Sequence, residues 1–167
     1  GVAQQAPGAP FEDIYTVTID VSSAWGNDGT ARLDLIDDSS IKNPAAATLL
    51  YGNFTTGQVY DFDQTDPTVT ICQGSSQDDP TTDVPIVFDI EFSENVAGVD
   101  ITDITIGTDP LAAVPLAVVT QVGSSSSDTY RLDITGIAFT GTTCTIITTV
   151  IAHAAQDGVG NNSEESP

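Results

Sequence analysis

Aspartates gather where the chain enters one of its alternating apolar segments. The stretch DFDQTDPTVTIC, residues 61–72, places Asp61, Asp63 and Asp66 directly before this segment. Carboxylate oxygens are hard ligands, and Ca²⁺ takes roughly six to eight such oxygens, supplied by several loops. These residues therefore suggest cation binding, which depends on the other acidic residues that the fold brings to the same place.

The chain as a whole is strongly acidic. Among its 167 residues, 24 Asp and Glu stand against 3 Lys and Arg, a formal net charge of -21. A basic patch that neutralises phosphates cannot be assembled from so few cations, so nucleic acids and anionic membrane surfaces are poor partners. Repulsion among the carboxylates destabilises a compact state unless divalent cations, salt or a basic partner screen it. Simple solubility, or adaptation to brine, is the alternative explanation of this charge.

Most apolar stretches alternate with a period of two residues, which is typical of half-buried strands. The alternation runs through residues 15–21, 31–35, 86–92 and 130–134. No stretch keeps a helical period, and Thr, Val and Ile are abundant. The longest apolar run, residues 111–119, is too short to span a bilayer. The pattern predicts an all-β fold without a membrane-inserted segment.

The chain also echoes itself, since DIYTVTIDV at 13–21 resembles DTYRLDITG at 128–136. Residues 66–164 resemble the tandem Ig-like, cadherin-like repeats of large bacterial surface and adhesion proteins. The resemblance rests on four motifs in order: Asp66-Pro67, PIVFDIEFSENV (85–96), VDITDI (99–104) and DGVGN (157–161). One departure is ITTVIAHAAQD, 147–157, which is longer than the usual final segment. The resemblance implies an Ig-like β-sandwich in an extracellular or cell-surface protein.

This comparison predicts three parts of the chain. Residues 1–10 form an arm or linker, residues 11–66 the closing strands of one Ig-like unit, and residues 67–167 a sandwich that lacks its last strand. The strands of the sandwich are expected at 67–72, 85–93, 99–107, 114–122, 129–136 and 144–154. An incomplete sandwich leaves unpaired backbone along one edge. Either the chain is a slice of a longer repeat protein, or a strand from a neighbouring subunit closes the gap.

Strand direction predicts which acidic residues meet. Because antiparallel neighbours alternate in direction, every second turn lies at the pole where the strand at 67–72 starts. The predicted Ca²⁺ ligands at this pole are Asp63, Asp66, Glu94, Asp103, Asp157 and Asn161. Asp61, Asp100 and Asp128 are expected beside them. The resemblance adds support, since interdomain cation sites occur in Ig-like and cadherin-like arrays.

Glu94 is the most informative of these acidic residues. Ile86, Phe88, Ile90 and Phe92 face one way, so Glu94 falls on the core-facing side at the end of its strand. A carboxylate in that position needs a partner. The partner is either a cation or a set of backbone N–H groups across the following turn.

At the opposite pole, strand direction brings Cys72 and Cys144 together, which predicts a disulfide. The bond would close a long loop, worth about 4 kcal/mol in the chain-entropy model. Two thiols are the alternative, because the alternation of Val69 and Ile71 turns Cys72 outward. Asp78, Asp79 and Asp83 lie at this pole as well, where they solvate a turn.

Two further features permit an exported protein without showing it. The sequons at Asn53 and Asn161 would be glycosylation acceptors in a glycosylating host. The chain begins GVAQQAPGAP without a methionine, as a processed product does. Both features fit an extracellular location.

Enzymatic chemistry has little support in the sequence. His153 is the only histidine, and neither a nucleophile elbow nor a zinc-binding spacing accompanies it. The sequence therefore predicts a non-enzymatic, extracellular structural module, a filament or surface-layer subunit or spacer. Its partners would be copies of itself or adjacent repeats, head to tail. The alternative is an adhesin that recognises a glycan or a protein through its loops.

Overall fold

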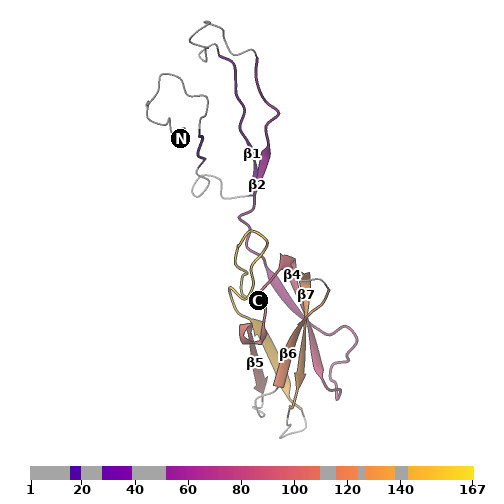
Figure 1. The fold of residues 1–167 in the computed structure, drawn as a ribbon. Helices are drawn as coiled ribbons and strands as arrows, with labels where there is room; N and C mark the ends of the chain where they lie inside the picture. The colour runs from indigo at the N-terminus through magenta and orange to yellow at the C-terminus, as the bar shows by residue number, and fades with distance from the viewer. Residues whose placement is uncertain (1–15, 20–27, 39–51, 110–115, 124–126, 138–142) are drawn as a thin grey trace. The chain divides into compact units, whose positions relative to one another are not determined.

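The structure is a computed structural model that describes residues 16–19, 28–38, 52–109, 116–123, 127–137 and 143–167 (Figure 1). The chain divides into two compact units, residues 1–64 and 65–167. The predicted arm at residues 1–10 lies outside the described residues, as do residues 15, 20 and 21 of the predicted strand at 15–21, and residues 16–19 do not form a strand.

The described residues of the first unit form an antiparallel ribbon. Strands β1 (Gly29–Arg32) and β2 (Val59–Phe62) pair from Gly29 opposite Phe62 to Arg32 opposite Val59. Beyond them Leu35 and Phe54 exchange two backbone hydrogen bonds of 2.9 and 2.8 Å. The ribbon carries large apolar side chains that stay exposed. They are Leu33, Leu35, Ile36, Phe54, Val59 and Tyr60.

The second unit is built on a four-stranded antiparallel sheet in the order β3-β4-β7-β6. Its strands are β3 (Val69–Gln73), β4 (Ile86–Val96), β6 (Leu116–Gln121) and β7 (Ser127–Thr135). Strand β4 pairs regularly with β7 up to Glu91, and the register then shifts before Val96. This irregular end of β4 carries Glu94.

A second sheet consists of β5 (Ile104–Asp109) paired antiparallel with β8 (Thr145–Val150). A single 3-10 turn, η1 (Ile101–Asp103), leads into β5. After β8 the chain forms further backbone bonds with the segment that ends at Ser166. Strands β5 and β8 therefore form a separate layer of the unit (Figure 1).

The core of the second unit lies between these sheets and follows the predicted alternation. Ile90, Leu132, Ile134 and Val150 are fully buried, and Phe92 packs edge-on against Tyr130, with the ring centroids 5.8 Å apart. Because side chains of a strand alternate between its faces, one face of each strand supplies this core. The prediction of an all-β fold is confirmed for the described residues, whereas the Ig-like assignment stays a prediction.

Two predicted strand ranges differ from the structure. The strand expected at 99–107 starts only at Ile104, because residues 101–103 form η1. The strand expected at 144–154 ends at Val150, and the chain turns soon afterwards at His153, whose φ is 64°. A positive φ is rare for a residue with a β-carbon and interrupts extended backbone.

Candidate metal centre

The turn that follows β8 is organised by one carboxylate, that of Asp157. Its Oδ1 accepts hydrogen bonds from the backbone nitrogens of Val159, Gly160 and Asn161, at 2.9, 2.6 and 2.9 Å. Its Oδ2 accepts from the side-chain nitrogen of Asn161 at 2.8 Å. Gly160 has a φ of 101°, which a residue with a β-carbon rarely adopts. The DGVGN motif is therefore a self-contained loop that fixes the orientation of Asp157.

These contacts decide the ionisation of Asp157. Burial raises the pKa of its carboxyl, but the hydrogen bonds from Asn161, Val159 and Gly160 outweigh this effect. The net pKa lies below the ordinary value of 3.8. Asp157 is therefore a carboxylate at neutral pH, the form that a cation requires.

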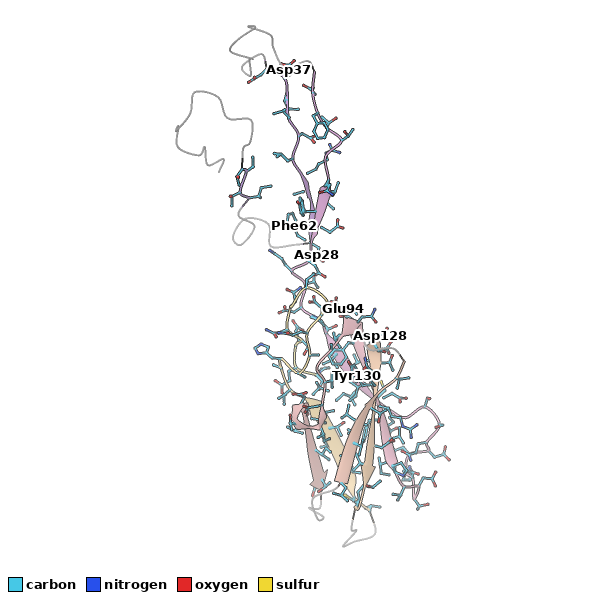
Figure 2. The ribbon with its side chains drawn as sticks, viewed as in Figure 1. Asp28, Asp37, Phe62, Glu94, Asp128 and Tyr130 are labelled. Carbon is cyan, nitrogen blue, oxygen red and sulfur yellow. The ribbon has the colours of Figure 1, made fainter. Side chains whose placement is uncertain are left out.

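Glu94 approaches from the irregular end of β4. It is half-buried, whereas its neighbours Ser93 and Asn95 are exposed. The sequence prediction that Glu94 continues the core-facing row of β4 agrees with this burial. Figure 2 shows Glu94 and Asp128 at the same end of the second unit.

Glu94 and Asp157 are the two members from the second unit of a group of three acidic residues that could hold a metal ion. Each offers one carboxylate oxygen, and these two oxygens lie within 4.8 Å of each other. Both residues are among the six ligands predicted from the sequence. Asp63, another predicted ligand, is exposed directly after β2 in the first unit.

Asp103, another predicted ligand, has a structural contact instead. Its Oδ2 accepts a hydrogen bond from the backbone nitrogen of Asp100 at 2.8 Å, and Asp100 Oδ1 accepts from the backbone nitrogen and the hydroxyl of Thr102. This reciprocal arrangement is a capping box at the start of η1. The hydrogen bonds from Thr102 lower the pKa of Asp100. Asp103 is outside the group of three, so its role as a ligand stays a prediction.

The remaining predicted ligands have different surroundings. Asp66 is exposed beside the fully buried Pro67, and it too is outside the group of three. Asn161 is half-buried and donates to Asp157, so it supports a candidate ligand.

Asp61, which was expected beside the ligands, is exposed in β2, opposite Thr30. Asp128 accepts a hydrogen bond from the hydroxyl of Thr129 at 2.9 Å.

Two serines that were not predicted to matter connect residues 163–166 to β8 and to the turn that follows it. Ser163 and Ser166 are both buried, and their hydroxyl oxygens accept from the backbone nitrogens of Ala155 and Val150, at 3.1 and 3.0 Å. A serine-rich acidic segment is usually solvated. No local pattern predicts these contacts, since they join residues 8 and 16 positions apart.

At the other predicted site, no disulfide joins Cys72 and Cys144. Cys72 is exposed, as the alternation of β3 requires, and Cys144 is half-buried with its thiol 3.5 Å from the carbonyl oxygen of Thr145. The pairing stays a prediction that a mass measurement without reductant would settle. Asp78, Asp79 and Asp83 belong to the loop between β3 and β4, and all three are exposed.

The two sequons also differ in their surroundings. The side-chain oxygen of Asn53 accepts from the backbone nitrogen of Asp37 at 2.7 Å in an exposed part of the first unit. The side-chain nitrogen of Asn161, which a glycan would modify, already donates to Asp157.

His153 is exposed at the turn after β8, and its backbone nitrogen donates to the carbonyl oxygen of Ser163.

Comparison of the chain with models of protein families, with curated proteins and with solved structures found no match. The described residues contain no helix long and apolar enough to cross a membrane.

Proposed function

We propose that the chain is an extracellular structural module, an Ig-like repeat that acts as a filament or surface-layer subunit or as a spacer, and that Ca²⁺ stiffens it. The proposal includes no enzymatic activity. The observation that carries it is the approach of the Glu94 and Asp157 carboxylates to within 4.8 Å of each other in the second unit. Ca²⁺ accepts such oxygens at flexible distances and completes its shell with backbone carbonyls and water.

The chemistry of the ligands favours Ca²⁺ over a transition metal. Glu94 and Asp157 are both carboxylates, and hard oxygen ligands select Ca²⁺ or Mg²⁺ rather than zinc or copper. Mg²⁺ demands near-ideal octahedral geometry, whereas Ca²⁺ tolerates an irregular set. Asp157 already accepts hydrogen bonds at both oxygens. Its contribution to a cation is therefore partial, which agrees with a weak site of about 10⁻⁴ to 10⁻³ M.

A bound cation would connect elements far apart in the sequence. Glu94 ends the long strand β4, and Asp157 lies in the loop after β8. Linking them would join the two sheets of the second unit, and neutralising their charge would relieve the repulsion expected in a chain of net charge -21. Both effects stabilise the folded unit against heat and force.

The test is calorimetric titration of the full chain with CaCl₂, together with the Glu94→Gln and Glu91→Gln variants. Glu91 is exposed on the same strand and outside the group, so it is the matched control. We expect Ca²⁺ affinity to fall about tenfold in Glu94→Gln, the loss of one charged ligand, and to stay unchanged in Glu91→Gln. Equal affinity in the two variants would remove the metal centre from the proposal.

An adhesin is the second candidate, and one observation favours it. Phe54 and Tyr60 in the first unit are 54% and 66% exposed, and aromatic residues of this kind often contact ligands. In the described part of the second unit, by contrast, Phe92 and Tyr130 are buried in the core. A glycan array probed with the chain and with the Tyr60→Ala variant distinguishes the two candidates, since a structural module gives no Tyr60-dependent signal.

A further inference from the structure

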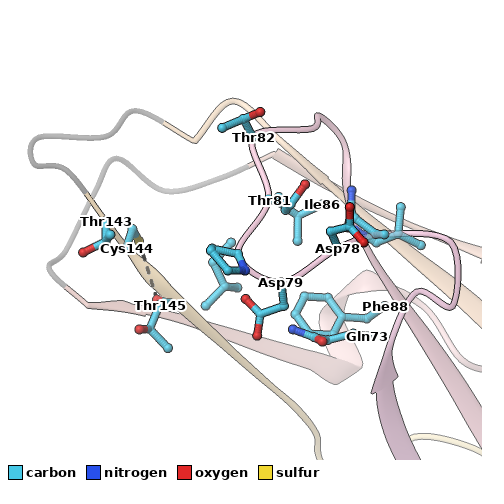
Figure 3. Close-up of a pocket in the computed structure, with 14 residues that line it drawn as sticks. Gln73, Asp78, Asp79, Thr81, Thr82, Ile86, Phe88, Thr143, Cys144 and Thr145 are labelled. Carbon is cyan, nitrogen blue, oxygen red and sulfur yellow. Dashed lines mark hydrogen bonds between the residues drawn. The ribbon is translucent and has the colours of Figure 1, made fainter.

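The second unit has a pocket at the start of β8, shown in Figure 3, with a volume of about 740 Å³. Its lining comes from three parts of the unit: residues 143–146, the loop residues 77–82, and the strand residues Gln73, Ile86, Val87 and Phe88. The pocket lies at the start of β4, whereas Glu94 lies near the other end of that strand. It is therefore separate from the candidate metal centre. Its size is within the range of small-molecule sites, about 300–1,000 Å³.

One wall of the pocket is apolar. Ile86, Phe88 and Ile146 line it, and all three pack against the core while staying half-buried. Their remaining apolar surface therefore faces the pocket. The ring of Phe88 adds an aromatic face, which attracts a positive charge.

The loop supplies two carboxylates to the same pocket, those of Asp78 and Asp79. Both residues are exposed, and neither carboxylate accepts a hydrogen bond or forms an ion pair with a residue that the structure describes. Asp103 and Asp133 differ, because each accepts a hydrogen bond from within the unit. In the view of Figure 3, Asp79 lies between Cys144 and the ring of Phe88. The two loop carboxylates are thus available to a ligand.

The start of this loop is held in place by Gln77. Its side-chain nitrogen donates to the carbonyl oxygen of Pro85, and its side-chain oxygen accepts from the backbone nitrogen of Val87, both at 2.8 Å. Both bonds are partly buried. Asp78 and Asp79 directly follow Gln77, so the fold itself sets where they enter the pocket.

An apolar wall opposite two carboxylates selects one kind of ligand. The carboxylates attract a positive charge and repel a negative one, and apolar surroundings strengthen both effects. The apolar wall suits an aliphatic stem, since long basic side chains bury their stems and keep the charged end near polar groups. A planar guanidinium can in addition stack on an aromatic ring.

The chain itself is a poor source of such a cation. The Nε of Arg32 lies 2.7 Å from Asp34 Oδ1, and the Nε of Arg131 lies 2.8 Å from Asp133 Oδ1. The remaining basic residue, Lys42, lies outside the described residues. With 3 Lys and Arg against 24 Asp and Glu, a second copy would bring mainly negative charge. The charge of the pocket is therefore complementary to a different molecule.

We infer that this pocket binds an organic cation, a guanidinium or ammonium group on an aliphatic stem. Asp78 and Asp79 hold the charge, while Ile86, Phe88 and Ile146 contact the stem. This is the chemistry of an arginine side chain and of a polyamine. The inference goes beyond the proposed function and does not depend on calcium.

The first test is calorimetric titration of the full chain, at low salt, with three probes. Butylguanidinium carries both the charge and the stem, guanidinium carries the charge alone, and butylurea carries the stem without the charge. We expect butylguanidinium to bind at least about fivefold more tightly than either of the others, because only it uses both walls. Equal binding of guanidinium or of butylurea would overturn the inference, as would no binding of butylguanidinium.

The second test compares Asp78→Asn and Asp79→Asn with Asp83→Asn. Asp83 is exposed in the same loop but does not line the pocket, so it is the matched control. We expect the affinity for butylguanidinium to fall about threefold in each pocket variant, the loss of one exposed charge pair, and to stay unchanged in Asp83→Asn. Unchanged urea unfolding would show that the variants are folded. Equal affinities in all three variants would contradict the assignment.

The thiol of Cys144 reports where the probe binds. Cys144 lines the pocket, and Cys72→Ser removes the other thiol. At ten times its dissociation constant, butylguanidinium should slow the reaction of Cys144 with a maleimide by about tenfold. A rate that does not change would place the binding elsewhere on the chain and overturn the inference.

Competition with butylguanidinium then distinguishes two sources of the cation. Tighter binding of a blocked Gly-Arg-Gly peptide would assign the pocket to a basic segment of a partner protein, and tighter binding of spermidine would assign it to a free polyamine. Failure of both to compete would overturn the inference. The calcium titration of Glu94→Gln tests the proposed function separately, so the two can fail independently.

Discussion

The hydroxyl of Tyr130 donates to the backbone carbonyl oxygen of Val96 at 2.9 Å in the buried interior of the second unit. Tyr130 lies in β7, and Val96 ends β4 just beyond the stretch where the register of the two strands shifts. The bond therefore holds the end of β4 to β7 just beyond the register shift, where Val96 also pairs with Ser127. Figure 2 labels Tyr130 and Glu94 in this part of the second unit. Glu94, two residues before Val96, depends on this attachment for its position.

Replacing Tyr130 by Phe should destabilise the second unit by about 1–3 kcal/mol, because a buried carbonyl loses its partner. It should also weaken Ca²⁺ binding, since Glu94 becomes less well positioned. Urea unfolding and calcium titration measure the two effects. Tyr60→Phe is the control, as Tyr60 is 66% exposed in the first unit. A Tyr130→Phe variant with unchanged stability would show that the bond contributes nothing to the fold.

The pH dependence of stability should reveal the loop held by Asp157. Its pKa is lowered in the folded state, so the stabilisation is complete above the ordinary value of 3.8 and is lost as pH falls through the lowered folded pKa. Asp157→Asn should therefore reduce stability at neutral pH and flatten its decline in acid. Asp109→Asn, at the exposed end of β5, is the matched control. Thermal unfolding at a series of pH values between neutral and acid measures the stability of each variant. If the stability of Asp157→Asn changed with pH in parallel with that of the unmodified chain, the prediction would be contradicted.

Gly74 should be intolerant of any side chain. A β-carbon there would lie 2.7 Å from Cγ1 and 2.8 Å from Cβ of Val87, closer than real contacts allow. Its backbone nitrogen also donates to the carbonyl oxygen of Val87 at 2.8 Å, so the two strands cannot separate without losing this bond. Gly74→Ala should cost about 1–3 kcal/mol of unfolding free energy.

Gly158→Ala is the control for this substitution, because its β-carbon would meet nothing within 4 Å. The two variants should differ clearly in the midpoint of urea unfolding. Similar midpoints would indicate that the start of the loop after β3 relaxes around the added methyl group.

Much of the fold could be predicted from local pattern. The alternation of residues 86–92 predicted both a strand and the inward direction of Glu94, because side-chain direction has a period of two. The DGVGN motif likewise marked a turn with an acidic residue, since Asp and Gly favour such backbone geometry. Two of the six predicted ligands, Glu94 and Asp157, bring their carboxylates together within the second unit.

What could not be predicted depends on contacts distant in sequence. The contacts of Ser163 with Ala155 and of Ser166 with Val150 have no local signature. The late start of β5 is different, because the Asp100-x-x-Asp103 spacing resembles a capping box and could have indicated the 3-10 turn. Asp103, which lies in that box, shows why topology alone was a poor guide to the ligands. Topology places a residue at one pole of the unit, but it does not show which contact the carboxylate of that residue makes.

The central claim is that Ca²⁺ mechanically stiffens a structural repeat. The most direct measurement is single-molecule stretching of the full chain, held at its two ends, in millimolar Ca²⁺ and in EDTA. At a Ca²⁺ concentration ten times the dissociation constant, binding should add about 1.4 kcal/mol to the stability of the folded state. We predict a higher unfolding force for the second unit in Ca²⁺ than in EDTA, with the difference lost in Glu94→Gln and kept in Glu91→Gln. The same unfolding force in Ca²⁺ and in EDTA would contradict the claim.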